Sequence, residues 1–288
     1  MITTLFDTFN EIEKGMENNA TQEAGDYVGE NGLLYCGICN TPKQARTPDN
    51  SFTRSIGKAG HIVPCMCKCA GERYEREMEE LRNTQRREEI ARKRRAGFPD
   101  WELSKFTFAN DDGKTPRISE AMKKYCFNFE KFKADGKGLL LYGSVETGKT
   151  YMACAVANEL IDKGYSCLCT NFSRIEKSLW SIEDKQGYFD ELNRYDLLVI
   201  DDLGAERKSD YMKEIVFNVI DSRDRVGLPM ILTTNLSLED LKNPKDIEDE
   251  RIYSRILKSC FPVEVEGVKR RREIVKRDYR EMKDLLGL

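Results

Sequence analysis

The chain has 288 residues and a net charge of −3, from 47 Lys and Arg against 50 Asp and Glu, and it contains ten cysteines. This length allows one large domain or two unequal ones, and the charge excludes uniform electrostatic wrapping of nucleic acid. No run approaches the roughly 20 apolar residues of a membrane span, and residues 1–10 lack a signal-peptide pattern, so we expect a cytoplasmic protein without membrane contact.

The N-terminal part contains a polar segment, residues 1–30, and then a cysteine-rich module, residues 31–70. A CxxC pair and a CxC pair supply four thiolates, the ligand number that Zn²⁺ favours. The module has few apolar residues, so a metal would have to hold it together. A reduced, metal-free loop is the alternative. The zinc ligands we select are Cys36, Cys39, Cys67 and Cys69, with His61 and Cys65 as alternates.

Residues 71–97 are dense in Glu and Arg, often at i,i+4 spacing, which predicts a solvated connecting helix. Its last turn carries the basic run 92–95. This run fits the negative end of a helix dipole, and a phosphate-contacting patch is the alternative. Gly97 and Pro99 then end the helix.

Residues 98–288 alternate short apolar runs with amphipathic stretches, which predicts an α/β domain with a parallel sheet covered on both faces. Amphipathic helices are expected over 150–163 and 211–225. The scattered cysteines of this part are expected to be buried as small apolar side chains. The predicted strands are Leu139–Tyr142, Ser166–Thr170, Leu197–Ile200, Met230–Thr234 and Phe261–Val265.

A glycine-rich phosphate loop follows the first of these strands and precedes a helix. Its pattern G-x-x-x-x-G-K-T lets backbone N–H groups wrap the phosphates of ATP, while Lys149 reaches the β- and γ-phosphates and Thr150 ligates Mg²⁺. Glu146 is unusual, because an acid beside a triphosphate is unfavourable. The nucleotide-binding residues are Gly143, Ser144, Val145, Glu146, Thr147, Gly148, Lys149 and Thr150.

The apolar strand at 197–200 ends in two acids. Downstream of a phosphate loop, Asp201 is expected to hold Mg²⁺ and Asp202 to act as general base toward the attacking water. The strand at 230–234 is followed by Asn235, which we expect to orient that water. An arginine of the segment 250–256 could stabilise the γ-phosphate in trans, although a plain surface helix is an equal alternative.

At this point the chain resembles AAA+ ATPases of the DnaC/DnaI helicase-loader type, with IstB-like transposition helpers closely related. The residues that carry the resemblance are the phosphate loop, LLVIDDLG at 197–204, ILTTN at 231–235 and ERIYSRI at 250–256. The cysteine module also looks like the zinc module of DnaI-like loaders. The resemblance covers residues 98–275 and implies a sheet of strand order 5-1-4-3-2.

The resemblance also implies roles for single residues. Asn235 corresponds to sensor 1, Arg255 to an arginine finger acting across a subunit boundary with Arg251 as helper, and Arg271 to sensor 2. The chain departs from the family at Glu146, where a glycine is common, and in a short C-terminal lid. Both departures predict weak ATPase activity in the isolated protein.

These residues predict an Mg²⁺-dependent ATPase that loads a hexameric replicative helicase onto single-stranded DNA and assembles with itself through the ATP site. The alternatives are an IstB-like transposition helper, or a zinc-stabilised ATP-binding adaptor with little turnover. The segment 172–180 carries Phe172 and Trp180, which we interpret as core residues. Contact with single-stranded DNA is the alternative for both.

Overall fold

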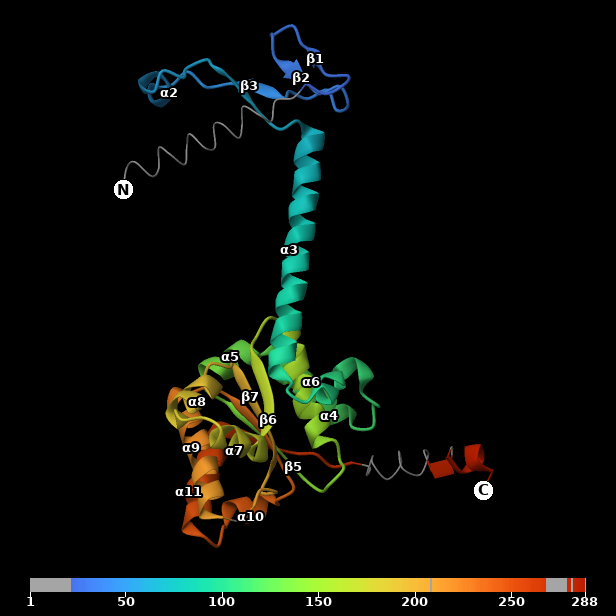
Figure 1. Cartoon of the computed structure of the whole chain (residues 1–288), viewed down its shortest axis with the longest axis vertical. Helices are drawn as coiled ribbons and strands as arrows, with labels where there is room; N and C mark the ends of the chain where they lie inside the picture. Colours follow the sequence, from blue (N-terminus) through green and yellow to red (C-terminus); the bar gives the residue numbers. More distant parts are fainter. Residues whose placement is uncertain (1–21, 208, 268–278, 281, 288) are drawn as a thin grey trace. The chain divides into compact units, whose positions relative to one another are not determined.

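The computed structural model describes residues 22–207, 209–267, 279–280 and 282–287 (Figure 1). The chain divides into two compact units, Met1–Arg86 and Arg87–Leu288. We call them the N-terminal unit and the C-terminal unit. The division falls inside one continuous helix, α3 (Lys68–Gly97). The helix expected over 71–97 therefore begins at Lys68 and belongs to both units.

The N-terminal unit contains two small antiparallel sheets. Strand β1 (Tyr27–Val28) pairs with β2 (Leu34–Tyr35), and β3 (Gln44–Arg46) pairs with β4 (Ile62–Pro64). Between β3 and β4 lies α2 (Ser51–Ser55), which is fixed by a capping box at Asn50. Among the described residues of this unit, the buried apolar side chains are Leu33, Leu34, Cys36 and Cys67. Such a small core needs an additional source of stability.

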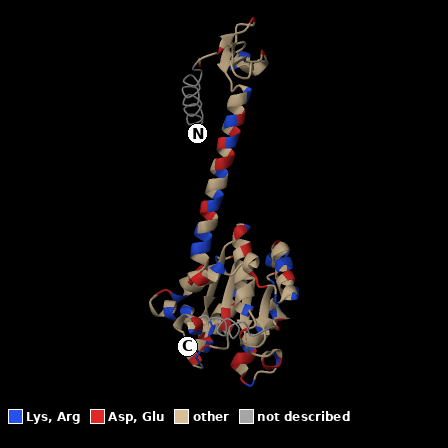
Figure 2. Ribbon diagram, turned by 90° about the vertical axis from the view of Figure 1, so that its right-hand side faces the viewer, with Lys and Arg blue, Asp and Glu red and all other residues tan. Residues whose placement is uncertain are grey.

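Helix α3 is charged along its whole length, with acidic and basic side chains interspersed (Figure 2). Near its end, Lys93 Nζ donates to the backbone oxygen of Gly164 at 2.5 Å. Arg94 bonds the side chains of Asn158 at 3.1 Å and Asp162 at 2.5 Å. Within the C-terminal unit, two cations of the basic run thus hold the end of α3 to residues 158–164, which supports a structural role for them.

The C-terminal unit is built on one five-stranded parallel sheet. Its spatial order is β6-β7-β8-β5-β9. When the strands are numbered along the chain within this sheet, that order read from the other edge is 5-1-4-3-2. The strands are β5 (Gly138–Tyr142), β6 (Cys167–Asn171), β7 (Leu197–Leu203), β8 (Met230–Thr234) and β9 (Cys260–Glu264).

Helices cover both faces of the sheet, because consecutive apolar residues of a strand point to opposite sides. Leu139 and Leu141 pack in one apolar cluster with the end of α3 and with α4, α5 and α6, whereas Leu140 packs in another with α7, α8, α9 and α11. The parallel sheet with helices on both faces is confirmed. No helix among the described residues is long and apolar enough to cross a membrane.

Most helices of this unit begin at a side-chain cap. Asn171, Asp184, Ser209, Ser237 and Asp246 each accept a backbone N–H in the first turn of the helix that follows. The short helices before the sheet are η1 (Trp101–Lys105) and η2 (Phe108–Asn110). The α-helices are α4 (Pro116–Phe127), α5 (Phe129–Ala134), α6 (Lys149–Asp162), α7 (Phe172–Trp180), α8 (Lys185–Leu192), α9 (Asp210–Val226), α10 (Leu238–Lys242) and α11 (Ile247–Ser259).

An arginine lies in the core of this unit. Arg223 on α9 is 0% exposed, and its guanidinium donates to the backbone oxygens of Pro229 and Leu192. Burial lowers the pKa of Arg223 to about 10. The side chain fixes the ends of α8 and α9 beside the start of β8. The scattered cysteines, Cys126, Cys154, Cys167, Cys169 and Cys260, are buried as expected.

Candidate functional site

The glycine-rich loop lies between β5 and α6, as the sequence predicts. Gly143 and Gly148 both have positive φ angles, 138° and 97°, which glycine adopts without penalty. A side chain at Gly143 would also come within 2.8 Å of the backbone oxygen of Val265. These two positions therefore require glycine. The loop ends at the N-terminus of α6, where free N–H groups and the helix dipole favour an anion.

Lys149 stands at the centre of the site. Its side chain is buried, and its Nζ donates to the backbone oxygens of Gly143 at 3.0 Å and Ser144 at 2.7 Å. A third bond of 2.8 Å reaches Oδ1 of Asn235, directly after β8. Burial lowers the pKa of Lys149, and the charges of Asp202 and Asp201 oppose this shift. Lys149 thus joins the phosphate loop to the polar end of β8.

A second series of hydrogen bonds joins α6 to the neighbouring strands β7 and β8. The hydroxyl of Thr150 donates to Oδ1 of Asp201 at 2.8 Å, and the hydroxyl of Thr233 donates to the same oxygen at 2.6 Å. Burial raises the pKa of the Asp201 carboxyl, although the two hydroxyl bonds lower it. A hydroxyl and a carboxylate held side by side form an oxygen-ligand set that suits Mg²⁺.

Asp202 adopts a left-handed backbone conformation with φ 57°. The register between β7 and β8 shifts at this point, between Ile200 and Leu203. The backbone N–H of Asp202 donates to the Thr233 hydroxyl at 2.9 Å, and its side chain is exposed. Such bulges re-aim side chains near functional sites at a cost in backbone strain. Thr233 thus contacts both acids.

The remaining loop residues have different environments. Ser144 and Val145 are exposed, whereas Thr147 is buried and its hydroxyl donates to the backbone oxygen of Ser144 at 3.1 Å. Glu146 has φ 71°, and its Oε2 atom is buried without a hydrogen-bond partner among the described residues. A buried carboxylate oxygen of this kind is costly.

Arg255 lies on α11, and its described contacts are on that helix and on α9. Its Nε donates to Asp221 at 2.9 Å, and its guanidinium lies 4.8 Å from the ring centre of Phe217. Arg251 is exposed one turn earlier. Among the described residues, none of these contacts reaches the phosphate loop of the same chain. The proposed sensor 2 residue, Arg271, lies outside the described residues.

The exposure of α7 corrects one expectation. Phe172 is buried in the core, as interpreted from the sequence, but Trp180 is 77% exposed. Arg174 and Lys177 are also exposed, and positions 174, 177 and 180 follow one another at three-residue spacing. Ile175 and Leu179 fill the inward face of the helix instead. The interpretation of Trp180 as a core residue was therefore wrong.

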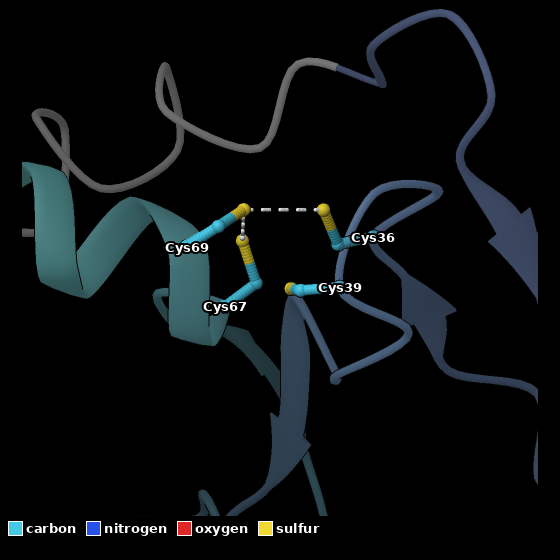
Figure 3. A group of neighbouring side chains, drawn as sticks. All are labelled: Cys36, Cys39, Cys67 and Cys69. Carbon is cyan, nitrogen blue, oxygen red and sulfur yellow. Dashed lines mark hydrogen bonds between the residues drawn. The ribbon is translucent and has the colours of Figure 1, made fainter.

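The second candidate site is the cysteine cluster of the N-terminal unit (Figure 3). One ligand atom from each of its four cysteines lies within 4.8 Å of all the others. The sulfur of Cys69 is 3.6 Å from that of Cys36 and 3.4 Å from that of Cys67. Four sulfurs at about 2.3 Å from one zinc ion are about 3.8 Å apart. The residues present therefore fit a tetrahedral metal.

The cluster consists of Cys36 and Cys39 after β2, and Cys67 and Cys69 at the start of α3. These are the four ligands selected from the sequence. The two alternates are not part of it: His61 and Cys65 are both exposed, and the Cys65 thiol lies 3.5 Å from the backbone oxygen of Pro42.

Local hydrogen bonds prepare part of this cluster for a cation. Backbone N–H groups of Cys39 and Ile38 lower the pKa of Cys36, and the Thr41 hydroxyl lowers the pKa of Cys39 to about 5. The neighbouring sulfurs, with Cys67 first, raise the pKa of Cys69 to about 12. A bound cation would therefore favour loss of the Cys69 proton.

Three supporting residues were not identified from the sequence. Thr41 contacts Cys39 and accepts the backbone N–H of Lys68, so it joins the turn after β2 to α3. Asp26 accepts the N–H of Gly37, and its bond to Lys43 is the main cause of a pKa lowered to about 2. Thr233 belongs to the polar run 233–235 at the end of β8, which was the available signal. Thr41 lies in a Thr-Pro turn beside the first cysteine pair, whereas Asp26 had no signal.

Comparison with known proteins now adds to this geometry. The profile of the IstB-like ATP binding protein family matches residues 72–277, well over half of the chain. The chain belongs to this family. Its members are ATP-binding proteins, which agrees with the phosphate loop and supports ATPase activity in general.

Two curated relatives are similar to the central part of the chain. One is the replicative helicase loader DnaI of Bacillus subtilis (strain 168), 31% identical over 149 residues, or 47% of this chain and 48% of that protein. The other is the replicative helicase loader DnaC of Escherichia coli (strain K12), 29% identical over 132 residues, or 44% and 53%. The chain thus spans about half the length of the curated relatives it matches.

A solved structure gives the same result for the fold. The crystal structure of the DnaI aligns with a TM-score of 0.50 at 26% sequence identity, and the alignment covers 60% of this chain and 94% of that one. The resemblance to DnaC/DnaI-type helicase loaders, stated from the motifs, is confirmed.

Proposed function

We propose that this protein is an ATP-driven switch that loads a hexameric replicative helicase onto single-stranded DNA in the cytoplasm. The observation that carries the proposal is the connected set of Lys149, Asn235, Thr150, Asp201 and Thr233, which links the phosphate loop to two neighbouring strands. It occurs in a chain whose curated relatives are replicative helicase loaders.

The chemistry follows from the positions of these groups. Lys149 exchanges its backbone acceptors for phosphate oxygens of ATP. Thr150 and Asp201 would hold Mg²⁺, which would supply positive charge to the phosphates. Asp202, exposed at the strand end, accepts the proton of the attacking water, and Asn235 orients that water. Thr233 positions both acids through its hydroxyl.

Self-assembly completes the site in this proposal. Arg255 is bound to Asp221 and has no described contact with the phosphate loop of its own chain. We therefore assign it to the γ-phosphate held by a neighbouring copy. A trans arginine makes hydrolysis depend on protein concentration. The rate per molecule should rise with concentration in the wild type, and it should stay low in Arg255→Ala. A rate per molecule that does not change with concentration would contradict self-assembly through the ATP site.

The contact with single-stranded DNA is assigned to α7. Single-strand binding surfaces combine basic side chains with exposed aromatic rings that stack on bases. Arg174, Lys177 and Trp180 provide this combination on one exposed stretch. Trp180→Ala should weaken binding of an oligonucleotide about tenfold. The exposed Trp101→Ala serves as a matched control, and an equal loss in both variants would contradict the assignment.

A transposition helper is the second candidate, because the matching family profile is that of IstB-like proteins. The two candidates differ in their partner. Immobilised protein with ATP should retain a purified hexameric replicative helicase and not a purified transposase. Retention of the transposase alone would overturn the loader assignment and favour the second candidate.

An ATP-binding adaptor with little turnover is a third candidate, and the buried charge of Glu146 favours it. ATP that remains intact after long incubation of the assembled protein with Mg²⁺ and DNA would favour the adaptor. Release of phosphate that is lost in Lys149→Ala would favour the switch.

A further inference from the structure

Glu146 is the acidic residue of the phosphate loop, 143–150, and it is partly buried. Its φ angle of 71° is positive, as are those of the loop glycines Gly143 and Gly148. One of its carboxylate oxygens, Oε2, has no hydrogen-bond partner among the described residues and is closed off from solvent. The fold thus keeps an unpaired negative oxygen in a loop whose N–H groups suit an anion.

A carboxylate in a phosphate-binding loop has an electrostatic effect on the nucleotide that the loop binds. The loop and the first turn of α6 provide the positive field that holds a nucleotide. A carboxylate inside the loop is attracted by the same field and repels the phosphates that enter it. The repulsion is strengthened where water is excluded, because the effective dielectric constant falls.

The contacts of Lys149 are a second reason to expect weak binding of the nucleotide. Its ammonium group already has three acceptors within the protein, the oxygens of Gly143, Ser144 and Asn235. Phosphate oxygens must replace at least part of this set. Bound nucleotide therefore gains less from Lys149 than it would from an unengaged lysine.

We propose that Glu146 is the residue that sets nucleotide exchange: its charge makes ATP and ADP leave the site rapidly, so that the switch resets without an exchange partner. This inference rests on the proposed ATP site. It concerns the lifetime of the bound nucleotide rather than the hydrolysis step.

Two substitutions separate charge from backbone conformation. Glu146→Gln removes the charge and keeps the left-handed backbone of a residue with a side chain. Glu146→Gly removes the charge and also relieves the backbone. Glu120→Gln on α4 is a matched control, because Glu120 is an exposed carboxylate 3.7 Å from Lys124.

The test measures dissociation of the N-methylanthraniloyl derivatives of ADP and ATP by stopped-flow fluorescence with Mg²⁺. Glu146→Gln should slow dissociation about tenfold, the change expected for removing one charge near a phosphate in a partly solvated site. Glu146→Gly should slow it by at least as much, and Glu120→Gln should equal the wild type.

The outcomes separate this inference from the function on which it rests. Unchanged dissociation in Glu146→Gln, with wild-type binding that is lost in Lys149→Ala, would overturn the role of Glu146 alone. Faster dissociation in Glu146→Gln would also overturn it, since the carboxylate would then pair with a nucleotide group. No binding by the wild type would overturn the ATP site and this inference together.

Discussion

The two units differ in what stabilises them. The C-terminal unit has apolar clusters on both faces of a five-stranded sheet. The described part of the N-terminal unit has short strands and few buried apolar side chains around its four clustered cysteines. A large core stabilises a fold by removing apolar area from water, whereas a small module depends on a crosslink or a metal. The two units of the chain should therefore unfold under different conditions.

Metal removal should have the largest effect. Binding of structural zinc contributes about 10 kcal/mol to small modules of this kind. Chelation, or Cys36→Ser, should therefore unfold the N-terminal unit and leave the C-terminal unit folded and able to bind ATP. Hydrogen exchange measured by mass spectrometry reports both units in one sample.

The matched control for this prediction is Cys65→Ser, which removes a thiol outside the cluster. It should retain one zinc ion per chain and normal exchange. Protection of the N-terminal unit that persists in metal-free protein would show that this unit is not stabilised by metal.

A substitution in the core should instead destabilise the C-terminal unit. Arg223→Met removes the guanidinium donors to the backbone oxygens of Pro229 and Leu192, and should lower the free energy of unfolding of the C-terminal unit by about 3 kcal/mol. Arg225→Met on the same helix removes an exposed guanidinium from Asp221, which keeps its bond to Arg255, and should cost less than about 1 kcal/mol. Equal losses in denaturant titrations would contradict the structural role of Arg223.

The next effect concerns catalysis. Thr233→Val keeps the shape of the side chain but removes its bonds to Asp201 and to the N–H of Asp202, and should lower kcat about 10- to 100-fold. Thr234→Val on the same strand removes a bond to the backbone oxygen of Leu203. It should change stability more than kcat. A similar fall in kcat in both variants would remove the special role of Thr233.

The smallest effect is expected for the strained loop residue. Glu146→Gly relieves a left-handed backbone and should raise the free energy of unfolding of the C-terminal unit by about 1 kcal/mol. Glu146→Gln keeps the same backbone requirement and should gain less. Thermal unfolding of the two variants compares them directly. A larger gain in the glutamine variant would show that charge, not backbone strain, dominates the effect on stability.

The sequence predicted the features that local spacing determines. The phosphate loop, the two acids near the end of β7 and the four clustered cysteines each follow from short motifs whose residues must meet. Strand and helix positions in the C-terminal unit followed from apolar periodicity. Arg255 and Arg271 are different, because their roles came from the family resemblance and stay predictions.

The features that were missed depend on contacts between distant segments. Thr233 meets Asp201 only because β7 and β8 are neighbours, and Asp26 meets Gly37 only across a folded turn. Trp180 has the same helical spacing as a core residue, yet the inward face of α7 is filled by Ile175 and Leu179. The strain at Asp202 arises from a register shift that residue spacing does not encode.

The most direct measurement of the central proposal is transfer of a hexameric replicative helicase onto closed circular single-stranded DNA. Wild-type protein with ATP should load the helicase, and Lys149→Ala should not, although its N-terminal unit should stay folded. Loading by Lys149→Ala, or by the wild type without nucleotide, at the full wild-type rate would contradict the assignment of this protein as an ATP-driven loader.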